Sequence, residues 1–248
     1  MFSWLKEEMT KEAEELFDFL YTKEFDVEIL RKELDTGRFK PDDVNRAAID
    51  YVQTCADLRH GDMYEVSTRR FGETVPGYED SHVVEALEIL LDYGLDPNKR
   101  YVEKDKDGHI RDCWNIMEDL SFVGNGYQAA DALYLLLTHG GNPNLKLDYT
   151  TIMDEVTDSV EFEINEREDM DDYAFDAIVH FWLVLTGFGG KSVNGSCPLD
   201  PVKNFDLSKL RNHRDYYYGE IYTKESKDGW GWQYCIFDRH TNREVARF

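Results

Sequence analysis

Two stretches of the chain share one pattern, Ala86-Leu-Glu-Ile-Leu-Leu-Asp-Tyr-Gly-Leu-Asp-Pro-Asn98 and Ala132-Leu-Tyr-Leu-Leu-Leu-Thr-His-Gly-Gly-Asn-Pro-Asn144. Alanine, leucines, glycine, proline and asparagine recur in register at an offset of 46 residues. Apolar residues spaced three and four apart predict an amphipathic helix in each stretch, because this spacing places them on one face. Gly94 and Gly140 are placed to end these helices in a left-handed conformation, and a third copy over 178–190 predicts the same role for Gly187.

A shorter repeat precedes the last two copies, as Trp114-Asn-Ile-Met-Glu-Asp-Leu120 and Thr150-Thr-Ile-Met-Asp-Glu-Val156. Its apolar spacing also predicts a helix, so the unit is a helix pair. One pair cannot bury its apolar face alone, which favours stacking of successive pairs. Further amphipathic helices are predicted over 3–21, 26–35 and 42–55, and the longer helices of the first and third copies are predicted over 81–93 and 174–186.

The ends of the longer helices, from Leu90-Leu91 to Asn98 and from Leu136-Leu137 to Asn144, resemble the second helix of ankyrin repeats. The Thr-Pro-Leu-His opening of that family is absent, and the period exceeds the family's ~33 residues, which would also suit HEAT-like helix pairs. The resemblance covers roughly residues 40–190. It implies a mainly α fold, an ankyrin-like helical repeat stack (α-solenoid), with the excess length placed in a hairpin over 101–111 and an acidic insertion over 158–171.

The sequence pattern changes after residue ~200, where aromatic and β-branched residues become frequent. Runs over 216–222, 230–237 and 244–248, separated by turn residues, predict a small antiparallel β meander of three strands. We therefore expect an N-terminal helical cap over 1–40, helix-pair repeats over 41–200 and the meander over 201–248. The meander could cap the last repeat or present its aromatic residues to a partner.

The chain is strongly acidic, with 51 Asp and Glu against 28 Lys and Arg and a net charge of −23. This charge argues against binding to nucleic acid or to an anionic membrane, because both require a cationic surface. No apolar run is long enough for a transmembrane helix, and early acidic residues argue against a signal peptide. The four cysteines contain no CxxC pair, which favours buried thiols over a metal or redox site. We expect a cytoplasmic protein, monomeric rather than oligomeric.

The acidity is concentrated between Asp154 and Asp176, where eleven acidic side chains accompany one base. Such runs are usually solvated helix faces. They can also attract a basic protein and accelerate its association. We predict that the partner-binding residues lie in the acidic insertion, and they are Glu161, Glu163, Glu166, Asp169, Asp171 and Asp172.

The motifs of catalysis and metal binding are incomplete. Asp105-Lys-Asp107-Gly108 imitates a calcium loop, but Trp114 stands where the bidentate Glu is needed. Gly189-Gly-Lys-Ser192 follows a predicted helix and lacks the upstream glycine of a phosphate loop. His180 lies on an apolar helix face and is expected in the core. The sequence predicts no enzyme, no cofactor and no metal.

The C-terminal ending, Ile236-Phe237-Asp238 followed by Glu244-Val-Ala-Arg-Phe248, completes a layout similar to a group of bacterial ankyrin-like proteins. Several proteins of that group are immunity partners of polymorphic or contact-dependent toxins. The resemblance implies a non-catalytic protein-binding module, specifically an immunity protein that covers a basic toxin domain with an acidic surface. Two alternatives remain: a general ankyrin-like intracellular adaptor, and a metal-dependent enzyme that uses the acidic clusters.

Overall fold

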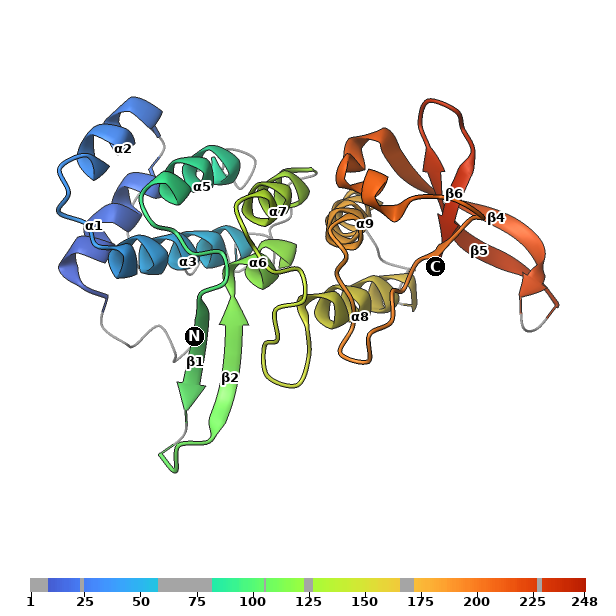
Figure 1. The fold of residues 1–248 in the computed structure, drawn as a ribbon, viewed down its shortest axis with the longest axis horizontal. Coiled ribbons are helices and arrows are strands. Elements are labelled where there is room, and N and C mark those ends of the chain that lie inside the picture. The colour runs from blue at the N-terminus through green and yellow to red at the C-terminus, as the bar shows by residue number, and fades with distance from the viewer. Residues whose placement is uncertain are drawn as a thin grey trace. The chain divides into compact units, whose positions relative to one another are not determined.

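The chain forms two compact units, Met1–Asn142 and Pro143–Phe248. The computed structural model describes residues 9–22, 25–57, 82–104, 106–122, 127–165, 172–226 and 229–248 (Figure 1). The predicted division at residues 40 and 200 stays a prediction.

The predicted fold class, a mainly α ankyrin-like solenoid, is wrong. About half of the chain is helical, but 16% is strand, and the strands form separate antiparallel sheets of two and four strands. The physical reason is that the repeated pattern specifies single helices and their ends. It does not specify how the helices associate or how the segments between and after them pair.

The first unit is built on helices α1 (Lys11–Leu20), α2 (Val27–Leu34), α3 (Pro41–Asp57), α5 (Val83–Asp92), α6 (Ile116–Asp119) and α7 (Gln128–Thr138). The helices predicted over 3–21, 26–35, 42–55 and 81–93 are confirmed where the chain is described. Helix α1 begins after Thr10, whose side chain accepts the N–H of Ala13. Its apolar face, formed by Ala13, Leu16, Phe17 and Leu20, is buried and packs against α3.

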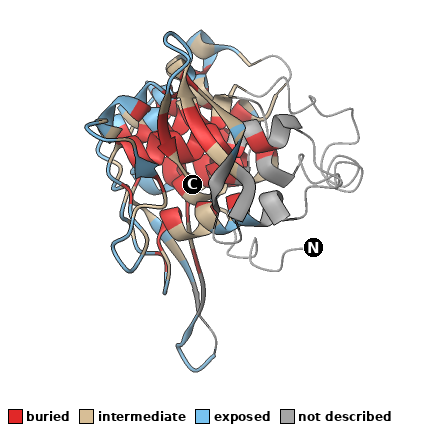
Figure 2. Cartoon of the chain, turned by 90° about the vertical axis from the view of Figure 1, so that its right-hand side faces the viewer, coloured by how far each residue is buried: buried red, intermediate tan, exposed pale blue. Residues whose placement is uncertain are grey.

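A hairpin of strands β1 (Arg100–Lys104) and β2 (Ile110–Asn115) confirms the hairpin predicted over 101–111. It extends away from the helices of its unit (Figure 1), and its tip is exposed (Figure 2). The short helix predicted from Trp114 begins only at Ile116, because Trp114 and Asn115 complete β2. Asn115 then caps α6 by accepting the N–H of Met117.

One asparagine contact recurs at three helix ends. In each case the side-chain amide donates to a glycine carbonyl, and its oxygen accepts a backbone N–H two residues further on. The three sets are Asn45 with Gly94 and Asp96, Asn98 with Gly140 and Asn142, and Asn144 with Gly189 and Lys191.

The glycine of each set adopts the left-handed conformation, with φ of +101° at Gly94, +92° at Gly140 and +84° at Gly189. The roles predicted for Gly94 and Gly140 are thus confirmed, whereas the third position is Gly189 and not Gly187. Gly187 is the last residue of its helix, and a Cβ there would lie 2.5 Å from the backbone nitrogen of Arg211.

The second unit joins helices α8 (Ile152–Asn165) and α9 (Asp172–Gly187) to strands β3 (Asp200–Pro201), β4 (Tyr216–Ser226), β5 (Gly229–Asp238) and β6 (Glu244–Arg247). The sheet order is β3-β6-β5-β4, so the three predicted strands are present and β3 adds a fourth. Helix α8 runs through Asn165, so residues 158–165 of the predicted insertion are helical.

The four-stranded sheet packs on α9 through aromatic side chains. Phe175 meets Tyr218 edge to face at 4.7 Å, and Trp182 meets Phe248 at 5.0 Å between ring centroids. Many residues of these helices and strands are therefore buried, as the colours of Figure 2 show. Cys55, Cys113 and Cys235 are among these buried residues, as expected, and Cys197 is half-buried.

Within the described part of the chain, no helix combines the length and the apolar character that crossing a bilayer requires.

Candidate functional site

The predicted partner-binding residues are only partly described. Glu161 is exposed on α8, Glu163 is on the same helix, and Asp172 is the first residue of α9. The side chains of Glu163 and Asp172 lie outside the described part of the chain, as do the whole residues Glu166, Asp169 and Asp171. That the six residues together bind a partner stays a prediction.

The acidic residues at the start of α8 have two different roles. Asp154 is structural, because its carboxylate accepts hydrogen bonds from the backbone and hydroxyl of Thr151 and from the backbone N–H of Val193. Asp158 and Glu161 are exposed one and two turns further along, and neither forms an ion pair with any described residue. Only the latter two can therefore offer their charge to a partner without loss of an internal contact.

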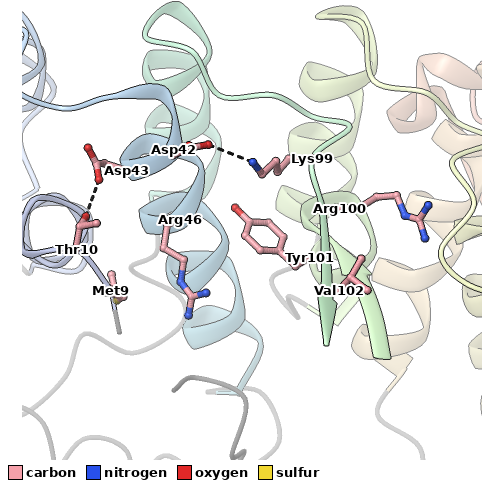
Figure 3. Close-up of a pocket in the computed structure, with 9 residues that line it drawn as sticks. All are labelled: Met9, Thr10, Asp42, Asp43, Arg46, Lys99, Arg100, Tyr101 and Val102. Carbon is pink, nitrogen blue, oxygen red and sulfur yellow. Dashed lines mark hydrogen bonds and ion pairs between the residues drawn. The ribbon is translucent and has the colours of Figure 1, made fainter. Parts of the chain in front are cut away.

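A cavity of about 360 Å³ lies in the first unit, at the root of the hairpin. Three segments contribute its walls: the two residues before α1, the first turns of α3, and the beginning of β1 with the residue before it (Figure 3). Its volume is within the range of pockets that hold small molecules or a partner's side chain. Sequence reasoning did not identify this pocket.

Arg46 projects from α3 into this space. Its Nε donates to Asp50 at 3.0 Å, and this aspartate is only 2% exposed. The two residues are one helical turn apart, which holds the guanidinium in place. The contact uses Nε and leaves the two terminal nitrogens of Arg46 without a partner among the described residues.

Tyr101 reaches toward α3 from β1 (Figure 3), and its ring stacks on Trp114 across the hairpin with centroids 6.0 Å apart. Burial raises the pKa of this hydroxyl, and the nearby Arg46 counters part of the rise. The hydroxyl is therefore a neutral donor at pH 7. Within the part of the chain that the structure describes, no group accepts its proton.

Lys99 completes the donor set. Its ammonium lies 3.1 Å from the carboxylate of Asp42, which is itself 90% exposed. An ion pair so open to water contributes little to stability and can exchange partners. Lys99 can therefore turn toward a ligand in the pocket at small cost.

Asp43 and Arg100, which also line the pocket, form hydrogen bonds within the protein. Asp43 is buried and accepts the Thr10 hydroxyl at 2.6 Å and the Lys40 N–H at 2.9 Å. Arg100 points away from α3 (Figure 3) and donates to the Sγ of Cys113 from Nε at 3.2 Å. The pocket therefore presents mainly hydrogen-bond donors to its interior.

One signal for this site was present in the sequence. Arg46 and Asp50 are four residues apart on a predicted helix, which is the spacing of an ion pair. The position of Tyr101 opposite them depends on how the hairpin leaves the helices, and no local pattern records that arrangement.

Among the described residues, no group of three or more His, Cys, Asp or Glu side chains is arranged to hold a metal ion. Comparison with protein-family profiles, with curated proteins and with solved structures finds no match for this chain.

Proposed function

We propose that this protein acts by binding a basic protein partner, and that the partner is a toxin domain which it neutralises. Binding is supported by exposed carboxylates that lie on successive turns of one helix and have no partner among the residues that the structure describes. Asp158 and Glu161 on α8 show this arrangement, and Glu85 and Glu88 repeat it on α5.

Like charges at this spacing destabilise a helix by about 0.2–0.5 kcal/mol per pair. Folding alone gains nothing from such repulsion, whereas a cationic partner would relieve it. The overall charge of −23 would also steer a basic protein toward the chain and raise the association rate.

The neutralising role is supported by the resemblance of the C-terminal ending to immunity proteins. In the structure these residues serve the sheet: Asp238 accepts the N–H groups of His240 and Thr241 at the turn, and Glu244 pairs with Arg247 on β6. The C-terminal ending therefore supports the resemblance as a structural element of the sheet. Because its polar side chains bond within the sheet, we place the residues that contact the partner on the acidic helices.

The experiment begins with capture of partners by the tagged full-length chain from its own cells at low salt, read by mass spectrometry. The partner is then purified and its association rate is measured over a salt series. We expect a basic protein whose association slows with salt, and slows at least severalfold for the double variant Asp158→Lys/Glu161→Lys.

A matched control reverses two exposed acids of the same unit, Asp148 in a loop and Asp200 at the start of β3, as Asp148→Lys/Asp200→Lys, which changes the net charge by the same amount. Equal slowing by both variants would show that only the net charge matters and not the position of the acids on α8. No slowing by either variant would contradict the binding proposal. Coexpression then tests neutralisation: the partner should arrest growth alone and not together with this chain.

A further inference from the structure

We propose that the pocket at the root of the hairpin binds a carboxylate group, with Arg46 as its principal ligand and with Lys99 and Tyr101 as additional donors. This inference is independent of the acidic helices and of the function proposed for them.

The argument starts from the geometry of Arg46. A guanidinium can receive one carboxylate along the edge that includes Nε and a second along the edge formed by its two terminal nitrogens. Asp50 contacts Nε and is almost fully buried, so it serves as the internal partner that fixes the side chain. The outer edge, with two parallel N–H groups, is left for a planar acceptor with two oxygens.

The surroundings of Arg46 favour the same kind of ligand. Tyr101 supplies a neutral hydroxyl that has no acceptor among the described residues, and Lys99 supplies an ammonium that pairs with an exposed carboxylate. The carboxylate of Asp43, which could compete for these donors, is occupied by Thr10 and Lys40. Donors therefore outnumber available acceptors inside the pocket, although acids outnumber bases in the chain as a whole, 51 to 28.

The positioning of these groups is already complete without a ligand. Arg46 is 17% exposed and is held by an ion pair on its own helix, and Tyr101 is held by its stacking on Trp114. Little side-chain freedom would be lost on binding, which improves affinity. The carboxylate could belong to a free small acid or to a Glu or Asp side chain of a protein partner.

Because Trp114 stacks on Tyr101, a label on Trp114 can report on ligand binding in the pocket. The full-length protein is labelled with 5-fluorotryptophan, and the Trp114 signal among the five tryptophans is assigned with Trp114→Phe. Fluorine NMR then follows two titrations, one with glutarate and one with an acetylated, amidated Gly-Glu-Gly peptide, each against sodium chloride of equal ionic strength. A ligand of this size is expected to bind with a Kd on the order of 10 mM.

Binding should shift the Trp114 signal with at least one of the two probes, and the responding probe identifies the source of the carboxylate. Arg46→Lys keeps the charge opposite Asp50 but removes the outer pair of N–H groups, so it should weaken binding roughly tenfold. Tyr101→Phe keeps the ring and removes one donor, and a loss of roughly threefold is expected.

Lys32→Gln is the matched control, because Lys32 is an exposed base on α2 and does not line the pocket. It should bind both probes as the unmodified protein does. The proposal is overturned if neither probe shifts the Trp114 signal beyond the chloride reference. It is equally overturned if Arg46→Lys and Tyr101→Phe both bind like Lys32→Gln.

Discussion

The Nδ1 atoms of His180 and His213 lie 3.2 Å apart inside the second unit, with the two side chains 0% and 3% exposed. A hydrogen bond between two such atoms requires one imidazole to donate and the other to accept, so the accepting ring is neutral. The sequence predicts that His180 is buried in the core, and its position on α9 confirms this. Its partner from the turn after Asn212 was not expected, because the two histidines are 33 residues apart.

The variant His213→Ala should lower the free energy of unfolding by about 2 kcal/mol, because it removes this hydrogen bond and leaves a cavity beside α9. Urea unfolding of the full chain measures the loss. The control is His240→Ala, whose side chain is 73% exposed and pairs only at the surface with Asp215. A similar loss in both variants would show that the buried pair has no special role.

The contact of Asn98 with the next helix end should be equally measurable. Its side chain donates to the carbonyl of Gly140 at 2.9 Å and accepts the N–H of Asn142 at 2.7 Å. Asn98→Ala removes both bonds and should cost about 1–2 kcal/mol of unfolding free energy. Asn98→Asp keeps the acceptor for Asn142 but places a carboxylate oxygen against the carbonyl oxygen of Gly140, so its loss in chemical denaturation should be at least as large as that of Asn98→Ala. A clearly smaller loss for Asp than for Ala would contradict the bond from Asn98 to Gly140.

Two neighbouring glycines should respond differently to the same substitution. Gly187→Ala would place a Cβ 2.5 Å from the backbone nitrogen of Arg211, so the packed segment must move, at a cost of about 2 kcal/mol or more. A Cβ at position 189 would have no atom within 4 Å. Gly189→Ala should therefore cost only the strain of a φ of +84°, about 1 kcal/mol of unfolding free energy. Thermal unfolding of the two variants gives the order, and the reverse order would refute the close contact at Gly187.

The stability of the protein should decline in alkaline solution. Burial raises the pKa of the Cys55 thiol from 9.0 to about 12, and burial likewise raises the pKa of the Tyr21 hydroxyl from 10.0 to about 12. Because both pKa values are higher in the folded state, the stabilisation is complete below pH ~9 and is lost as the pH rises toward ~12. Each group adds a slope of at most about 1.4 kcal/mol per pH unit.

Urea unfolding at several pH values between 8 and 11 tests this decline. Cys55→Ala should make it shallower, whereas Cys197→Ser, at a half-buried thiol, should leave it unchanged. An unfolding free energy independent of pH over this range would be incompatible with a buried thiol at position 55.

The sequence by itself determined the local elements of this protein. The spacing of Leu87, Leu90 and Leu91 specifies a helix, and Gly94 ends it, because both effects depend on residues within one or two turns. The strands β4, β5 and β6 follow from runs of aromatic and β-branched residues, and they and the hairpin follow from the turn residues between the strands, for the same reason.

Only the tertiary structure decided what these elements form together. The repeat pattern indicated a uniform helical stack, yet the chain makes two units with separate sheets, because the association of elements depends on contacts between distant residues. The pairing of β3 with β6, the meeting of His180 with His213, and the approach of Tyr101 to Arg46 are all of this kind. Each joins segments more than 30 residues apart, and a periodicity read over a few turns carries no information about such distances.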